Sequence, residues 1–371
     1  YDQRYDGAIG QVYLDTTFDM EAGDYLLLQV ISDNGTTVYR YYKADVGLYD
    51  QLSSITSRVI YGVLYKEAFR ALVAQYTGQD NAVSSSIFND TYKGVVTNGR
   101  YFRGITGTNP AISLSLDELF DSLSLFCIGI GVESIAGVET LVIEPMSYFF
   151  QSLVILDLSG RIAEASITKE VLPEMYANRL RFGFESFDYD YSGGVYEFNT
   201  SSTWSTVLKQ ITSEFAIMSK LRGDTTGIFK ALSEIDASKD TDTDEHNYML
   251  DVVTSGANYL ARTDEGFSMV SGTTATFQMF NLDYSPARTL RRWGAYIRAM
   301  LWQNRQSYLR WQASDKNTTI ESQLTGEDIV TENADVLVSD LDENLWINER
   351  YTCEVPLEES DFAAITANPY G

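Results

Sequence analysis

The chain has 371 residues, of which 44% are hydrophobic, and this composition suits a globular protein of about two or three domains. Its 52 acidic and 27 basic residues give a formal net charge of −25, so broad binding to nucleic-acid phosphates is not expected. The longest apolar runs are too short to span a membrane, and two cysteines, Cys127 and Cys353, cannot build a disulfide framework. We expect both thiols to be buried in a protein made in a reducing compartment, and both chain ends to be cuts within a longer polypeptide.

The N-terminal region is predicted to hold a β hairpin and one long helix. Residues 25–31 and 36–42 have the composition of strands, and Asn34 and Gly35 between them are a strong hairpin signal. Apolar residues then recur at helical spacing over residues 53–76.

A glycine, Gly78, follows this helix as its expected stop. Residues 77–113 are rich in turn residues, which favours loops. Gly104 and Gly107 lie among them, but no lysine follows, so we exclude a phosphate-binding loop.

Residues 114–150 are predicted to form a helix packed on a hairpin. Ser115 is a suitable N-cap, and Leu119, Phe120 and Leu123 repeat with helical spacing. Two β runs follow, at 127–133 and 140–144, with a turn at Gly137 between them. We interpret this stretch as architecture, because it contains no nucleophile or ligand cluster.

Residues 153–158, 178–187 and 194–199 are predicted to be strands. Asp188 and Asp190 stand among aromatic residues, as in a glycosidase, but alternation along an exposed strand also places two carboxylates on one face, and we favour that explanation.

Residues 206–221 fit an amphipathic helix, and their length leaves a strand open.

The densest acidic stretch, residues 234–251, contains the only histidine, His246. Asp240, Asp242 and Asp244 imitate the start of a calcium loop, but Glu245 occupies the position where that loop needs glycine. We favour a solvated polar loop over a metal site, and a single histidine supports no catalytic triad. The sequence therefore predicts no catalytic, cofactor-binding or metal-binding residue, and an enzyme is not expected.

The C-terminal region opens with a predicted amphipathic helix over residues 288–303. Its apolar side holds Leu290, Trp293, Ile297, Met300, Leu301 and Asn304. The opposite side holds Arg288, Arg291, Arg292, Arg298, Trp302 and Arg305. We expect these six residues to form an interface with an acidic surface of a neighbouring subunit, since arginine binds carboxylates with two parallel hydrogen bonds. The alternative is a helix packed on its own domain, with its arginines paired to local acids.

The remaining residues are predicted to form five strands and a last helix. The strands lie at 308–313, 318–324, 329–330, 334–338 and 349–355. The helix spans 361–367, with Ser360 as its cap.

These elements predict an α+β protein, mainly antiparallel β, built as barrel- or sandwich-like small domains with a few amphipathic helices. We expect three domains. Residues 1–110 would form a β-rich domain with one long helix, 111–285 the helix-hairpin and β-rich domain, and 286–371 a helix-plus-β domain.

Short blocks along most of the chain beyond its N-terminal region carry a resemblance. They include Thr97-Asn-Gly-Arg-Tyr-Phe-Arg103, Gly129-Ile-Gly-Val-Glu133, Tyr176-Ala-Asn-Arg-Leu-Arg-Phe-Gly183, Glu332-Asn-Ala-Asp335 and Asn368-Pro-Tyr-Gly371. In these blocks the chain resembles large structural virion proteins of tailed phages and prophages of Bacteroidota. None of the blocks is a catalytic motif.

The resemblance implies a structural subunit of a phage tail, in the tail tip or baseplate hub, made in the host cytoplasm and carried in the virion. It implies a homo-oligomer, as a closed ring, that touches other tail proteins and needs no cofactor, nucleic acid or membrane span. The alternative is a virion protein that binds a receptor, or binds or cleaves carbohydrate, and such a protein would present an aromatic-lined groove. A host-derived enzyme comes third.

Overall fold

The structure is a computed structural model that describes residues 59–90, 92–105, 112–151, 153–163, 166–185, 200–207, 210, 212–234, 238–256, 258–264, 267–269, 273–274, 279–301, 307–312, 320–324, 326–368 and 370. Ser54–Gly371 forms one compact unit, distinct from Tyr1–Ser53. The predicted hairpin at 25–42, the strand at 194–199 and the acids Asp188 and Asp190 all lie outside the described residues.

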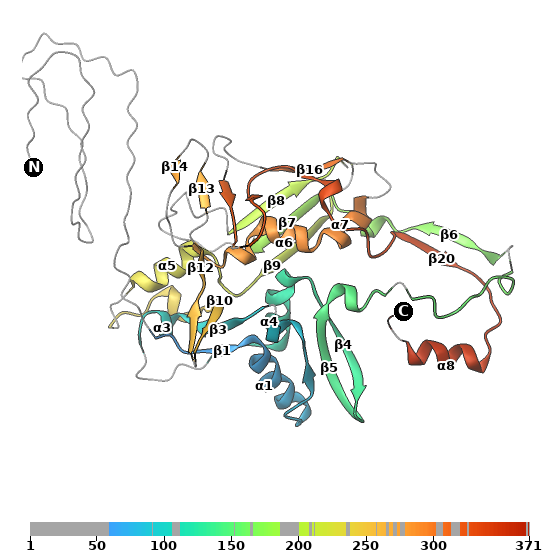
Figure 1. The fold of residues 1–371 in the computed structure, drawn as a ribbon, viewed down its shortest axis with the longest axis horizontal. Helices are drawn as coiled ribbons and strands as arrows, with labels where there is room; N and C mark the ends of the chain where they lie inside the picture. The colour runs from blue at the N-terminus through green and yellow to red at the C-terminus, as the bar shows by residue number, and fades with distance from the viewer. Residues whose placement is uncertain are drawn as a thin grey trace, which may run out of the picture. The chain divides into compact units, whose positions relative to one another are not determined.

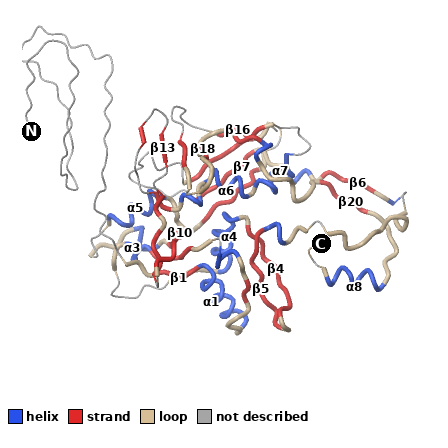
Figure 2. The backbone as a smooth tube through the Cα atoms, in the orientation of Figure 1, coloured by secondary structure: helices blue, strands red, loops and turns tan. Residues whose placement is uncertain are grey.

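The predicted helix and hairpin of residues 114–150 are confirmed. Helix α4 (Leu116–Leu123) begins with a capping box, in which the Ser115 hydroxyl accepts from the Glu118 backbone and the Glu118 carboxylate accepts from the Ser115 backbone. Strands β4 (Ile128–Ile135) and β5 (Val138–Pro145) pair antiparallel along their full length, and Figure 2 shows them side by side. Ala136 and Gly137 both have positive φ (53° and 82°), as a tight hairpin turn requires.

Another sheet has the order β1-β3-β10-β11. Its strands are β1 (Gly62–Leu64), β3 (Gly94–Asn98), β10 (Asn247–Ser255) and β11 (Asn258–Ala261). Within the described residues, the helix predicted over 53–76 begins with α1 (Tyr65–Thr77), because Gly62–Leu64 pair with β3. A Cβ atom on Gly62 would lie 2.9 Å from the Val96 carbonyl oxygen, so this close pairing depends on glycine. Gly78, at φ 71°, ends α1 as predicted.

The region predicted as loops, residues 77–113, instead contains β3 and three short elements. These are β2 (Val83–Ser84), α2 (Ile87–Asp90) and α3 (Gly99–Phe102). Val96 and Thr97 are fully buried in β3, which lies between β1 and β10 in the sheet. The turn residues on either side of β3 led to the prediction of a loop where the structure has an inner strand.

A five-stranded sheet has the order β19-β16-β8-β7-β9 (Figure 1). Its strands are β7 (Arg179–Phe184), β8 (Ser201–Ser205), β9 (Glu214–Ser219), β16 (Tyr308–Trp311) and β19 (Val336–Leu337). The helix predicted over 206–221 is wrong, and the strand left open is correct for β9, because Phe215 and Ile217 alternate toward a buried cluster. Helices α6 (Pro286–Arg292) and α7 (Gly294–Leu301) contribute buried side chains to the same cluster.

The other elements are short. They are α5 (Thr225–Ser233), α8 (Glu359–Ala367), β6 (Thr168–Val171), β12 (Thr263–Asp264), β13 (Phe267–Met269), β14 (Thr273–Thr274), β15 (Met279–Phe280), β17 (Ile320–Ser322), β18 (Val330–Thr331) and β20 (Glu349–Thr352), with 3-10 turns that include η1 (Ser124–Phe126), η6 (Asp242–Glu245) and η7 (Leu282–Tyr284). The strand predicted over 153–158 is absent from the described part of that stretch, where Leu153 and Val154 are 57% and 80% exposed. Helix α8 is capped by Glu358 with Asp361, rather than by Ser360.

The predicted α+β class is confirmed, with small and mostly antiparallel sheets. The strands that the structure describes close no barrel. The pairing of β3 with β10 crosses the expected domain boundary at residue 110, and the pairing of β8 with β16 crosses the one at 285. Within the described ranges, no helix is long and apolar enough to span a membrane.

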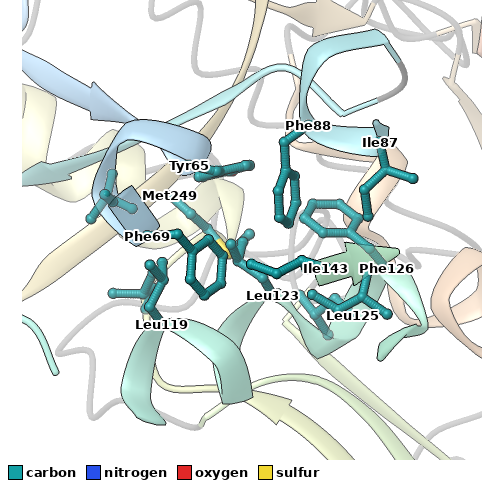
Figure 3. Close-up of a cluster of buried hydrophobic side chains, with 14 of the residues drawn as sticks. Tyr65, Phe69, Ile87, Phe88, Leu119, Leu123, Leu125, Phe126, Ile143 and Met249 are labelled. Atoms are coloured by element: carbon teal, nitrogen blue, oxygen red, sulfur yellow. The ribbon is translucent and has the colours of Figure 1, made fainter. Parts of the chain in front are cut away.

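Three clusters of buried hydrophobic side chains form the core. The first joins α1, α2, α4, η1 and the hairpin, as Figure 3 shows for Tyr65, Phe69, Phe88, Leu119 and Phe126. The second lies between the five-stranded sheet and α6–α7, and the third lies around Phe102 and Tyr248. Of the α4 residues expected to be core, Leu119 and Leu123 are fully buried, whereas Phe120 is only partly buried.

We therefore expect Leu119→Ala to lower the free energy of unfolding by about 2–5 kcal/mol, the usual effect of removing a buried leucine side chain. Leu153→Ala, at a 57% exposed position, is the control and should change it by less than about 0.5 kcal/mol. Urea unfolding measures both, and equal stabilities for the two variants would show that α4 is not part of the core.

Candidate interaction surfaces

The arginine-rich segment consists of two helices rather than the one predicted. Helix α6 ends at Arg292, Trp293 lies between the helices, and α7 begins at Gly294. The predicted apolar side is confirmed for its described residues, because Leu290, Trp293, Ile297, Met300 and Leu301 all belong to the second core cluster, and Asn304 lies outside the described residues. The Trp293 indole also donates a hydrogen bond to the Ser124 carbonyl (2.9 Å), which fixes this segment against η1.

Arg288 lies inside the protein. Its guanidinium donates to Glu332 Oε1 at 2.6 Å and to Ser322 Oγ at 2.7 Å, and the side chains of Arg288 and Glu332 are 5% and 0% exposed. Burial raises the pKa of the Glu332 carboxyl, and Arg288 opposes that shift. The pair is a desolvated ion pair within one subunit.

The other described arginines of this segment also contact their own chain. Arg292 pairs with Asp283, and its guanidinium lies 5.3 Å from the centre of the Tyr92 ring. Arg291 donates to the Ala287 carbonyl and Arg298 to the Leu341 carbonyl, both at 2.9 Å. Burial lowers the pKa of Arg291.

These contacts correspond to the alternative that the sequence left open, in which the helix packs on its own domain. Trp302 and Arg305 of the expected interface lie outside the described residues.

The acidic stretch of residues 234–251 is only partly a solvated loop. The side chain of Asp240 is 96% exposed, but Asp244 is buried in an ion pair with Arg103, whose guanidinium also donates to the carbonyls of Glu234 (3.0 Å) and Lys239 (2.7 Å). Arg103 therefore fixes this stretch from inside. The sequence pattern missed this role because the two partners are 141 residues apart.

Asp251 is also buried, 3.3 Å from Arg262. Burial lowers the pKa of His246, so its imidazole is neutral at pH 7. Among the described residues there is no group of three or more His, Cys, Asp or Glu side chains that could hold a metal ion.

We use the name "arm" for the described residues within 151–175 and 347–370. Strands β6 and β20 form its two-stranded sheet, with Glu170 opposite Arg350 and Lys169 opposite Tyr351. No residue of the arm belongs to any of the three core clusters. Its large exposed hydrophobic residues are Leu153, Val154, Ile167, Val171, Ile347, Tyr351, Leu357, Phe362 and Ile365. The arm thus exposes nine large hydrophobic side chains to water.

Polar contacts and the aromatic contacts of Tyr370 with Tyr148 and Phe149 hold the arm. Arg161 donates to Asp361 at the start of α8 (Nη1–Oδ1 3.2 Å) and to the Pro356 carbonyl (2.6 Å). These hydrogen bonds lower the pKa of the Asp361 carboxyl. Tyr370 packs against Phe149 with ring centres 5.0 Å apart, above Gly131, where a Cβ atom would lie 2.4 Å from the Tyr370 hydroxyl. Tyr370 of the C-terminal segment therefore packs closely over a glycine of the hairpin.

We use the name "sheet face" for the side of the five-stranded sheet that bears Arg179, Arg181, Arg310, Thr203 and Ser205. Arg179 and Arg310 both lie opposite Ser205 in register, and Arg181 lies opposite Thr203. Their neighbours in the strands, which include Leu180, Trp204 and Leu309, point to the other side and are fully buried.

Three arginines are thus gathered on one side of a sheet in a chain of net charge −25. The Arg179 side chain is 57% exposed and lies 3.4 Å from Glu214, and Arg310 is also exposed. Arg181 has no ion pair with any residue in the described ranges. The alternation of arginine and apolar residues in 179–182 is the sequence signal for this face.

Comparison with known proteins finds no family model, no curated protein and no solved structure that matches this chain.

We expect Arg288→Met to lower stability by about 3–5 kcal/mol at pH 7, because it leaves the Glu332 carboxylate buried without its cation. Without Arg288, the pKa of Glu332 in the folded variant should rise further above the pKa that this group has in the unfolded chain. The variant should therefore lose stability as the pH rises from the unfolded pKa to the folded pKa, and it should regain part of that stability on acidification.

Chemical unfolding at pH 5 and pH 7 measures this effect. Arg310→Met, on the exposed sheet face, is the control and should stay within about 0.5 kcal/mol of the unmodified chain at both values. A deficit of Arg288→Met that does not change with pH would contradict the assignment to Glu332.

For the arm, we expect Arg161→Ala to release α8, since Arg161 bonds both Asp361 and the chain just before the helix. Hydrogen exchange should show the amides of α8 losing their protection while those of β7 keep theirs. Arg350→Ala, which removes a 3.7 Å pair between two mostly exposed side chains, is the matched control and should leave α8 protected. Protection of α8 that survives Arg161→Ala would mean that another contact holds the helix.

Proposed function

We propose that this chain is a structural subunit of a tailed-phage virion, in the tail tip or baseplate hub, which acts by binding to copies of itself and to other tail proteins. The observation that carries the proposal is the arm, an ordered part of the chain that exposes apolar side chains and contributes none to the core clusters. The resemblance of short sequence blocks to phage virion proteins supports the same role.

The physical reason lies in the elements of the arm. A two-stranded sheet is at best marginally stable in water, and a helix as short as α8 (9 residues) is not stable alone. The side chains of Phe362 and Ile365 in α8 are 56% and 43% exposed, and Tyr351 and Val171 in the small sheet are 55% and 43% exposed. Contact with another molecule would remove this surface from water and stabilise both elements.

The chain carries a second exposed apolar region at the end of the β4–β5 hairpin. Val132, Ile135 and Val138 are 66%, 44% and 42% exposed there, next to the tight turn. A strand pair that ends in apolar residues suits insertion into a neighbouring subunit, and this is the second feature that favours an assembly role.

The proposal is tested on the particle. Gold-labelled antibodies raised against the chain should mark the tail end of tailed particles induced from a host that encodes it, and a virion component should copurify with those particles. A chain that is absent from purified particles, or that hydrolyses capsular polysaccharide at a measurable rate, would overturn the structural role in favour of an enzyme.

A further inference from the structure

We propose that the sheet face binds the arm of a second copy of this chain, so that copies associate head to tail. The inference rests on the proposed function only in assuming that copies assemble, and it identifies the two surfaces that meet. One copy contributes Arg179, Arg181 and Arg310, and the next contributes exposed carboxylates and apolar side chains of its arm.

Charge is the first reason. The arm carries eight acidic and three basic residues among those described, so it is negative, as the whole chain is at −25. Copies of such a chain repel one another unless a basic surface lies at their contact. On this face the three inner strands β7, β8 and β16 carry the three arginines, whereas the nearby described acids lie at the margins: Glu214 in β9, Asp335 beside β19 and Glu185 just after β7. The inner strands therefore provide such a basic surface.

The availability of the groups is the second reason. The carboxylate of Glu170 is 65% exposed, and Glu354 and Glu359 are exposed in the segment that leads into and begins α8. On the sheet face, the arginines lie opposite two small residues, Thr203 and Ser205, and the Arg310 guanidinium lies 5.9 Å from the centre of the Tyr308 ring. A planar guanidinium can donate two parallel hydrogen bonds to a carboxylate, so three arginines on one sheet form an ordered set of donors for an acidic segment.

Apolar surface on both sides is the third reason. The sheet face is flanked by Leu337, 51% exposed, in the edge strand β19, and by Ala216 in the other edge strand, β9. The arm offers Tyr351, Phe362 and Ile365 close to its carboxylates. Charge pairs select the partner and its orientation, while apolar burial contributes the affinity that screened surface pairs lack.

The geometry of such a contact has a consequence for assembly. The two surfaces are different parts of the chain, so the contact is heterologous, and each copy keeps one free surface after binding. Repetition of the contact gives a closed ring if the rotation between copies closes, or a filament if it does not.

The test is charge reversal on each surface separately. The face variant is Arg181→Glu with Arg310→Glu, and the arm variant is Glu354→Lys with Glu359→Lys. Sedimentation equilibrium over a range of protein concentrations and at about 0.05 and 0.5 M salt gives the association constants. We expect each variant to associate at least about tenfold more weakly than the unmodified chain, and we expect salt to weaken the association of the unmodified chain.

Two further chains make the result specific. The combined variant carries all four substitutions, restores opposite charges across the contact, and should recover association to within about threefold of the unmodified chain. The control, Lys93→Glu with Lys220→Glu, makes the same change in net charge as the face variant at exposed positions off both surfaces, and it should associate normally. Melting temperatures check that all the variants are folded.

The outcomes separate this inference from the proposed function. If the unmodified chain assembles and the face variant assembles equally well, the surfaces are wrong while a virion role stands. Weakening that the combined variant does not reverse overturns the pairing of these two surfaces. An unmodified chain that stays monomeric at every concentration overturns the inference, whereas gold labelling of the tail end tests the proposed function independently.

Discussion

The packing around the ring of Phe126 is the constraint on which the rest of the structure depends. That ring lies 4.1 Å from the ring of Tyr92 and 4.9 Å from that of Tyr284, centre to centre, and it also touches Tyr65 and Phe88. These partners come from α1, α2, η7 and the segment before β3, so one side chain joins elements far apart in the chain. Arg292 lies over the same cluster and connects it to α6. Aromatic pairs of this kind contribute about 0.5–1.5 kcal/mol each beyond their buried area.

The sequence predicted well those elements whose signals are local. Helix α4 and the β4–β5 hairpin were found with their cap and turn, because a capping box and a tight turn are short patterns. Strand β3 was missed, since Val96 and Thr97 are flanked by turn residues and become strand only by pairing with β1 and β10. Strand β9 had a helical pattern in the sequence for a related reason. It pairs in parallel with β7, 35 residues earlier, and such a distant pairing produces no local sequence signal.

The expected interface on the arginine helices shows the same limit at the level of a site. The segment does have an apolar side and an arginine side, as predicted. The charge of an arginine does not show whether its guanidinium binds a neighbouring subunit or its own chain. The partner of Arg288 is Glu332, 44 residues away, and the hydroxyls of Ser285 and Ser322 also donate to the same carboxylate oxygen, Oε1. Burying this pair required all four groups together, which only tertiary structure reveals. The arginines of the sheet face alternate with Leu180 and Phe182, and that pattern was present in the sequence.

The arm is held by polar and aromatic contacts, whereas the rest of the described chain is stabilised by buried hydrophobic clusters. Its strands and α8 are ordered by ion pairs such as Arg161 with Asp361 and Lys169 with Glu349, between groups that water partly solvates. Such pairs stabilise weakly, whereas ordering the residues of the arm costs backbone and side-chain entropy at every position. Cores normally offset that cost, and the arm has none of its own. A segment in this balance is held in shape but not strongly stabilised, and the apolar burial it lacks is what a bound neighbour would supply.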